Sequence, residues 1–171
     1  LYELSVGAHV HFLSRVPSPK IIMQALAEVK PYVIIAVPLV IEKIYKSKVK
    51  PVLEKEGIRF LMKLPVLNQV VLNKVKTELI NAFGGEFYEV IIGGAAFNTE
   101  VEAFFKRMGF PFTVGYGMTE CAPIITYDDW EEEKLYSCGK AAPHMGVRVN
   151  SAYPANFPGE IQIKGANVFL G

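Results

Sequence analysis

Two glycine-rich segments carry the residues of this sequence that could do chemistry. Gly93-Gly94-Ala95-Ala96 follows the apolar run FYEVII, and Gly115-Tyr116-Gly117-Met118-Thr119-Glu120 follows FTV. Small residues let a backbone approach a ligand closely and expose its N–H groups to an anion. In the second segment Tyr116 offers a ring for stacking on a purine, Thr119 a hydroxyl for a phosphate oxygen, and Glu120 a carboxylate for Mg²⁺.

Neither segment matches a standard nucleotide-binding motif. Gly139-Lys140 is followed by Ala141 and lacks the upstream glycine of a P-loop. The dinucleotide fingerprint requires a third glycine and a helix that follows it. A glycine after a strand is more often part of a turn than of a ligand site. Two such segments, one of which carries Thr119-Glu120, leave a turn and a ligand site about equally favoured by spacing alone.

The order of apolar runs predicts strands that alternate with helices. Strands are expected at residues 8–13, 32–37, 87–92 and 112–114. Helices are expected at residues 20–29, 39–54 (with an end or a kink at Pro51), 72–83, and from a cap at Asn98 or Thr99 to Gly109. Residues 57–68 show no clear pattern.

This alternation of elements predicts an α/β fold, with a parallel sheet that carries helices on its faces. Runs such as YVIIAV are typical of a strand buried on both faces. Ligands of such sheets bind beyond the carboxyl ends of the strands. Both glycine-rich segments stand at such ends.

The pattern changes near residue 135. Residues 128–134 (DDWEEEK) form an acidic loop or turn, and residues 146–150 and 160–164 then alternate as antiparallel strands do. We therefore predict an α/β region over residues 1–134 and the beginning of a β-rich subdomain, incomplete, over residues 135–171. Because the chain begins with Leu1 and closes directly after the apolar run 168–170, we expect an internal piece of a longer protein.

Composition excludes several classes of protein. The chain has 171 residues, of which 51% are hydrophobic, too many for a disordered chain. Lys+Arg is 18 and Asp+Glu is 17, and this near balance argues against a nucleic-acid-binding protein. Cys121 and Cys138 form neither a disulfide framework nor a zinc motif, which favours reduced thiols and a cytoplasmic location. The longest apolar run, residues 31–41, is too short to span a bilayer.

Other polar residues receive plainer interpretations. His9 and His11 alternate along the first expected strand, but no third metal ligand is near in sequence. Four lysines could touch anionic lipid heads: Lys43, Lys46, Lys48 and Lys50. Glu42 and Glu54 flank them and favour a solvated helix face, so peripheral membrane contact stays open. The edges and apolar faces of a sheet cut from its neighbours also favour dimerisation of the isolated chain.

At the level of whole motifs, the sequence resembles the adenylate-forming (AMP-binding) superfamily. YGMTE resembles the central signature of that superfamily, and a GGA loop precedes it at the end of a strand about twenty residues earlier, as the superfamily has it. Three further segments resemble the long-chain fatty-acid–CoA ligase branch in the same order: PYVIIAVPLVIEKIY, SCGKAAPHMGVRV and GEIQIKGANVFLG. The resemblance covers nearly the whole chain.

The resemblance implies a ligase that uses ATP, Mg²⁺ and coenzyme A. A fatty-acid carboxylate would attack the α-phosphate of ATP to give an acyl-adenylate, and the coenzyme A thiol would then displace AMP. By motif match, Thr119 and Glu120 would be catalytic, with Thr119 on phosphate and Glu120 on Mg²⁺. The other residues implied to line the nucleotide and the acyl group are Gly94, Ala95, Ala96, Gly115, Tyr116, Gly117 and Met118, with Tyr116 stacked on adenine.

Other elements of the superfamily are expected before Leu1 and after Gly171, namely the phosphate loop, the ribose-binding Asp and the lid lysine. We therefore predict that the 171-residue piece alone has no ligase activity. Leu39, Phe97 and Cys121 differ from the residues common at their places, and Phe97 and Cys121 bear on which acid is accepted. Two alternatives stay open: an aryl- or amino-acid-activating ligase, and a non-catalytic relative that binds lipid or a partner.

Overall fold

A computed structural model describes residues 6–14 and 18–169. The chain folds as two compact units. The helical unit comprises the residues up to Tyr32 together with Leu39–Tyr88, and the sheet unit comprises Val33–Pro38 together with the residues from Glu89 onward.

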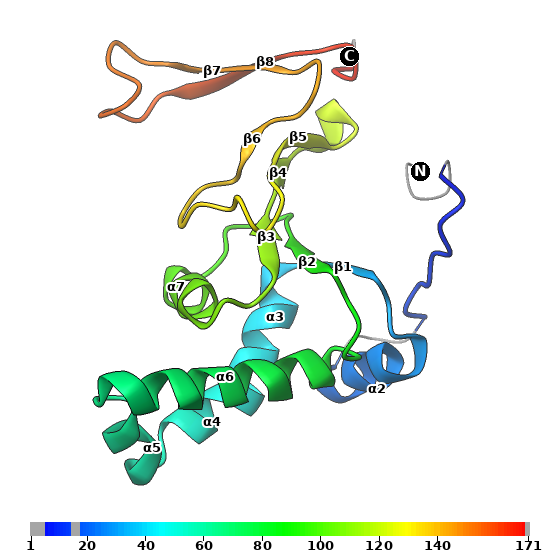
Figure 1. The fold of residues 1–171 in the computed structure, drawn as a ribbon. Coiled ribbons are helices and arrows are strands. Elements are labelled where there is room, and N and C mark those ends of the chain that lie inside the picture. The colour runs from blue at the N-terminus through cyan, green and yellow to red at the C-terminus, as the bar shows by residue number, and fades with distance from the viewer. Residues whose placement is uncertain (1–5, 15–17, 170–171) are drawn as a thin grey trace. The chain divides into compact units, whose positions relative to one another are not determined.

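The helices described in the helical unit, which Figure 1 shows in blue to green, are α2 Pro19–Val29, α3 Pro38–Ile44, the π-helical Tyr45–Val49, α4 Lys50–Leu53, α5 Glu56–Leu61 and α6 Pro65–Ala82. Ser18 caps α2 by accepting a hydrogen bond from the Ile21 N–H, as its side chain predicts. The apolar stripe of α6 is buried, at Val71, Leu72, Val75 and Leu79.

Pro51 interrupts the helix predicted over residues 39–54. A proline has no N–H, and its ring collides with the carbonyl of the residue four positions earlier. The chain responds just before the proline, where the Lys50 N–H donates to the Tyr45 carbonyl five residues back and makes a π-turn. The helix α4 then resumes with Pro51 in its first turn. The predicted interruption is confirmed.

Two sequence predictions in this unit were wrong or incomplete. Residues 8–13, predicted as a strand, form no regular element, and most of them are exposed. Alternation by itself does not make a strand, because a strand needs a neighbour for its hydrogen bonds. Residues 57–68, which show no clear pattern, form α5 and the first turn of α6. Gly57 and Pro65 obscured these helices, although Pro65 stands at a first-turn position that suits it.

The sheet unit is built on three parallel strands, β1 Val33–Ala36, β2 Glu89–Ile92 and β3 Phe112–Val114, in the order β1-β2-β3. One face packs against α7 Thr99–Met108, where the Phe105 ring lies 5.8 Å from that of Phe112 and 6.2 Å from that of Phe97. The predicted α/β class, with a parallel sheet and helices, is confirmed.

The prediction that 32–37 is buried on both faces was wrong for this chain. Ile34 is buried, but Ile35 is 66% exposed. Within the described residues β1 is the edge strand of its sheet, and its second face lacks a covering element. A continuous apolar run reports that a strand can be buried on both faces, and the packing decides whether it is.

Beyond β3 the unit becomes antiparallel (Figure 1, yellow to red). The strands β4 Tyr116–Gly117, β5 Ile124–Tyr127 and β6 Lys140–Ala141 form one small sheet, and β7 Gly146–Asn150 pairs with β8 Glu160–Lys164 in another. The β7–β8 pair confirms the antiparallel strands expected there. The pairing of β5 with β6 links residues on the two sides of the predicted 134/135 boundary, and the two compact units divide at other positions in the chain. The boundary between an α/β region and a β-rich subdomain at 134/135 stays a prediction.

Candidate functional site

The two glycine-rich segments leave neighbouring parallel strands at the same edge of the sheet. The hydrogen-bond ladder continues into both of them, since the Gly93 N–H donates to the Ala36 carbonyl at 3.2 Å and the Gly115 N–H donates to the Ile92 carbonyl at 2.9 Å. A Cβ built on Gly93 would lie 3.3 Å from the Gly115 carbonyl oxygen. The segments therefore begin side by side, in close backbone contact, where a ligand of an α/β sheet is expected.

The first segment presents bare backbone between β2 and α7. Gly94 has a φ of +86°, in the left-handed region that favours glycine, and Gly94–Ala96 is exposed. Asn98 then caps α7, accepting hydrogen bonds from the N–H groups of Glu100 and Val101. Phe97 turns the other way into the aromatic core and is only 8% exposed. Phe97, one of the three residues in which the sequence differs from those common in the superfamily, thus packs against α7.

The second segment folds into a tight turn. Tyr116 and Gly117 form β4, and Thr119–Cys121 makes one turn of 3₁₀-helix. The Met118 N–H donates to the Pro123 carbonyl at 2.9 Å, and a Cβ on Gly117 would lie 2.3 Å from that same oxygen. Gly117 is therefore required by the turn itself, whatever its part in an acyl path.

Thr119 and Glu120 point away from the core of this turn. Both residues are exposed, whereas Cys121 beside them is buried. Across the described part of the chain, neither side chain has a hydrogen-bond partner, although the backbone beneath them is held. The Phe169 N–H donates to the Glu120 carbonyl at 2.9 Å, and the Asn167 amide donates to the Cys121 carbonyl. The arrangement presents a hydroxyl and a carboxylate on a fixed backbone, free to meet a ligand.

The support from Asn167 and Phe169 was missed by sequence reasoning. The Gly165-Ala166-Asn167 run signals a turn after β8. Nothing in that run indicates which distant carbonyl the turn would reach. This contact comes from the tertiary path of the chain and ties the last described residues to the Thr119–Cys121 turn.

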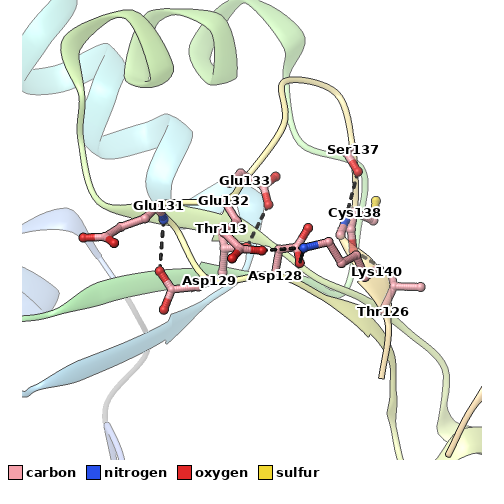
Figure 2. A network of polar contacts seen from close by, with 11 residues as sticks. Thr113, Thr126, Asp128, Asp129, Glu131, Glu132, Glu133, Ser137, Cys138 and Lys140 are labelled. Carbon is pink, nitrogen blue, oxygen red and sulfur yellow. Dashed lines mark hydrogen bonds and ion pairs between the residues drawn. The ribbon is translucent and has the colours of Figure 1, made fainter. Parts of the chain in front are cut away.

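A second polar cluster lies in the sheet unit, at the middle of β3 and the beginning of β2. Figure 2 shows Thr113, which is fully buried and donates to a carboxylate oxygen of Glu133 at 2.9 Å. The Tyr127 hydroxyl donates to Glu89, the first residue of β2. Burial raises the pKa of the Glu133 carboxyl and also that of the Glu89 carboxyl, because a charged carboxylate is costly away from water.

The loop that carries Glu133 is held from both of its sides. The Glu102 carboxylate on α7 accepts a hydrogen bond from the Tyr136 N–H, and the Lys106 ammonium donates to the Glu133 carbonyl. Lys140 pairs with Asp128 at 3.4 Å and also with Glu132 (Figure 2). The predicted acidic loop, residues 128–134, is therefore a folded segment that is bonded to β3 through Glu133, and we call it the brace. Sequence reasoning missed Glu133, because nothing distinguishes it from the two glutamates before it.

The chemistry of the donor set tests whether nucleotide and metal fit. Over residues 6–14 and 18–169, no group of three or more His, Cys, Asp or Glu is arranged to hold a metal ion, and His9 and His11 belong to no such group. Glu120 alone could hold only a cation that takes its other ligands from phosphate and water. Mg²⁺ binds in this way, through one or two carboxylates and substrate phosphates. An exposed Thr119 hydroxyl, a half-buried Tyr116 and the open Gly94–Ala96 backbone fit a phosphorylated purine beside it.

Comparison with known proteins defines the class. The profile of the AMP-binding enzyme family matches residues 1–171, so the chain belongs to the AMP-binding enzyme family. Among curated relatives, it is 29% identical to long chain acyl-CoA synthetase 5 of Arabidopsis thaliana, over 89% of this chain and 27% of that protein. The chain thus spans about a quarter of the length of such relatives.

Solved structures share the fold. A benzoate CoA ligase from Burkholderia xenovorans superposes with a TM-score of 0.65 at 19% identity, over 97% of this chain and 29% of that one. An o-succinylbenzoate coenzyme A synthetase from Bacillus subtilis, in complex with ATP and magnesium ion, gives 0.55 at 21% identity, over 91% of this chain and 27% of that one. These similarities establish the adenylate-forming fold for the chain.

Proposed function

We propose that the protein carrying this chain is an ATP-dependent acyl-CoA synthetase acting on long or medium fatty acids. The observation that carries the proposal is the Thr119–Glu120 turn, with both side chains exposed and unpartnered, in a segment whose Gly115 lies next to Gly93 of the other glycine-rich segment. Membership of the AMP-binding family supports ATP as the substrate that meets this turn. The curated relatives named as long-chain acyl-CoA synthetases support the fatty acid.

The reaction joins two anions, and this is the difficulty that the site must overcome. A carboxylate oxygen forms a bond to the α-phosphorus of ATP, and pyrophosphate leaves. The thiol sulfur of coenzyme A then bonds to the acyl carbon, and AMP leaves. Preorganised donors near the phosphates lower the barrier because they need no reorganisation as charge moves.

Each residue has a defined task in this proposal. The Thr119 hydroxyl donates to a phosphate oxygen, and the Glu120 carboxylate holds Mg²⁺. When bound, that ion neutralises phosphate charge. The Tyr116 ring stacks on adenine, and the Gly94–Ala96 backbone lies along the nucleotide and the acyl carboxylate. The flanking residues Gly115, Gly117 and Met118 also line the nucleotide and the acyl group. ATP and Mg²⁺ in the Bacillus subtilis relative are consistent with these assignments.

We also propose a cytoplasmic location. The two cysteines are free thiols, one of them buried at Cys121 and the other exposed at Cys138. Partial desolvation of the Cys138 sulfur raises the pKa of its thiol although the residue is exposed, and the Glu133 and Glu102 carboxylates raise it further. An exposed free cysteine is typical of a reducing compartment.

Product profiling tests the function. The protein carrying this chain is incubated with ATP, Mg²⁺, coenzyme A and one of several acids: palmitate, octanoate, benzoate or an amino acid. We expect acyl-CoA and AMP with the fatty acids. An aryl-CoA product formed in preference would replace the fatty acid with an aryl acid, an outcome to include because the structural neighbours include a benzoate ligase. Absence of AMP formation with every acid would favour a non-catalytic, binding relative.

A further inference from the structure

The positive charge of this chain is concentrated in one stretch of the helical unit. Residues 43–76 contain nine lysines and arginines against two glutamates, a formal charge of +7, while the whole chain carries only +1. The stretch runs from the end of α3 to the middle of α6. The near-neutral total therefore conceals a strongly basic region.

An exposed apolar patch lies inside this basic stretch. Five large apolar residues of α5, of the turn after it and of the beginning of α6 face solvent, and we call them the α5–α6 patch: Phe60, Leu64, Val66, Leu67 and Val70. Phe60 is 64% exposed, Val66 78% and Val70 61%. Five large exposed apolar residues within residues 60–70 are more than the scattered single groups of an ordinary surface, and such a concentration marks an interaction site.

Basic residues alternate with the patch residues along the chain. Arg59 precedes Phe60 on α5, Lys63 precedes Leu64 in the turn between α5 and α6, and Lys74 lies one helical turn after Val70 on α6. All three basic residues are exposed. Among the residues that the structure describes, none of the three forms an ion pair, so their charge is available to a partner.

Two of the four lysines between residues 43 and 50, unlike the three basic residues beside the patch, form ion pairs with glutamates. Lys46 lies 4.0 Å from Glu42, and Lys50 lies 3.8 Å from Glu54, both as pairs along a helix. Such pairs are typical of a solvated helix face, as the sequence favours for this segment. Lys43 and Lys48 are exposed within the same stretch and add to its general positive field.

We propose that the α5–α6 patch docks on the surface of an anionic phospholipid bilayer. Exposed basic residues interspersed with exposed aromatic and aliphatic side chains provide the chemistry of interfacial binding, in which the apolar groups enter the headgroup boundary and the cations meet lipid phosphates. Over the described residues, no helix has the length and apolarity to cross a bilayer. The inference rests on the patch alone and does not depend on the proposed function.

Two other partners fit these observations less well. A second copy of the chain would bring two regions of +7 together, at a large cost in repulsion. A nucleic-acid interface is polar and strongly basic, whereas this segment also exposes the large apolar side chains of Phe60, Val66 and Val70. A bilayer surface uses both parts of the patch.

Vesicle flotation tests the proposal. The protein is mixed with vesicles of phosphatidylcholine alone or with about one third phosphatidylglycerol, a content that gives the anionic surface to which basic residues respond. We expect binding to the anionic vesicles, weakened strongly by salt, and little binding to the neutral ones. Phe60→Ser with Val66→Ser should weaken binding by at least about tenfold, the share of a buried aromatic group.

A charge variant tests the contribution of the basic residues next to the patch. Arg59→Gln with Lys63→Gln should weaken binding by about 30-fold, which corresponds to about 2 kcal/mol at about 1 kcal/mol per basic residue. The matched apolar control is Tyr153→Ser with Phe157→Ser, since these two residues are equally exposed in the connection between β7 and β8. The matched charge control is Lys164→Gln on β8. Neither control should change binding, and circular dichroism verifies that every variant is folded.

Several results would overturn the proposal. Equal binding to neutral and anionic vesicles, or no binding to either, contradicts it directly. So does a loss of binding in the Tyr153/Phe157 control as large as in the Phe60/Val66 variant. A dimer in light scattering that the Phe60/Val66 variant abolishes, without any vesicle binding, would assign the patch to self-association. Because none of these readouts is ligase activity, they stand apart from a failure of the proposed function.

Discussion

Two polar regions, one within β3 and one in the segment that follows it, differ in their exposure and in their hydrogen bonds. At its carboxyl end, Thr119 and Glu120 are exposed, and within residues 6–14 and 18–169 their side chains lack partners. In its middle, Thr113 is buried and bonded to Glu133. The buried Thr113 hydroxyl donates to one Glu133 oxygen, Oε2, and this bond holds the strand, while the other oxygen, Oε1, has no hydrogen-bond partner among the described residues. The exposed pair makes no such bond, so its hydroxyl and carboxylate remain available to a ligand.

The largest expected effect is on catalysis at the exposed pair. Glu120→Gln in the protein carrying this chain should lower kcat/KM for acyl-CoA formation by about a hundredfold or more, the scale of losing one preorganised electrostatic group. Its urea midpoint should be unchanged, since the exposed side chain has no hydrogen-bond or ion-pair partner among the described residues. Glu131→Gln, an exposed carboxylate in the brace, is the matched control and should have normal activity. Normal activity in Glu120→Gln would remove the proposed Mg²⁺ role.

The next effect is on the turn that carries the exposed pair. Gly117→Ala places a Cβ 2.3 Å from the Pro123 carbonyl oxygen and should cost about 3 kcal/mol in the free energy of unfolding. Gly115→Ala places its Cβ at an ordinary 3.5 Å from the Thr126 carbonyl and should cost less than about 1 kcal/mol. Urea unfolding of both variants measures the difference. Equal stability of the two would show that the turn adapts.

A smaller effect on stability is expected at the buried pair. Thr113→Val keeps the shape of the side chain but leaves a Glu133 oxygen without its donor, and should cost about 2 kcal/mol of unfolding free energy. Thr77→Val, whose hydroxyl bonds to the Asn73 carbonyl on the exposed face of α6, is the control and should cost under about 0.5 kcal/mol. Loss of kcat at full stability in Thr113→Val would instead make Thr113 part of the site.

The smallest effect is in the pH dependence of stability. Because burial raises the pKa of Glu133 above 4.5 in the folded state, only the folded state holds this proton in the window between the two values. Stability from this group is therefore present below about pH 4.5 and is lost as pH rises through the folded pKa. Relative to Glu133→Gln, the unmodified protein should lose stability across that rise, as measured by urea midpoints.

Glu131→Gln serves again as the control for this pH series, because its carboxylate is exposed. The urea midpoint of this variant should change with pH in the same way as that of the unmodified protein. A Glu133→Gln variant that also ran parallel would mean that burial costs the Glu133 charge nothing in the folded protein. The brace would then be a solvated loop and the contrast with the exposed turn would disappear.

Much of this architecture could be predicted because local chemistry decides it. Ser18 and Asn98 cap helices through their own side chains, and Pro51 interrupts one through its missing N–H. The short apolar run that predicts a strand at residues 87–92 forms β2 at Glu89–Ile92. The two glycine-rich segments were assigned to strand ends by sequence position alone. These features need only neighbours a few residues away.

Other predictions failed where distant partners decide. Residues 8–13 alternate like a strand, but without a strand beside them their hydrogen bonds have no ladder to join. Ile35 is apolar enough for a core and is exposed, because burial needs a covering element. Glu133 and Glu131 are indistinguishable as letters, yet one is bonded to Thr113 inside the protein and the other faces water.

The sequence by itself determined the α/β class, the capped and interrupted helices, the motif that places the chain among AMP-binding enzymes, and the total charge. Only the tertiary structure decided that Thr119 and Glu120 stand free while Thr113 and Glu133 are buried together, and that a near-neutral chain gathers its charge around an exposed apolar patch. The physical reason is range. Backbone propensity and motif act between residues close in sequence, whereas desolvation, partner satisfaction and surface charge depend on which distant segments the fold brings together.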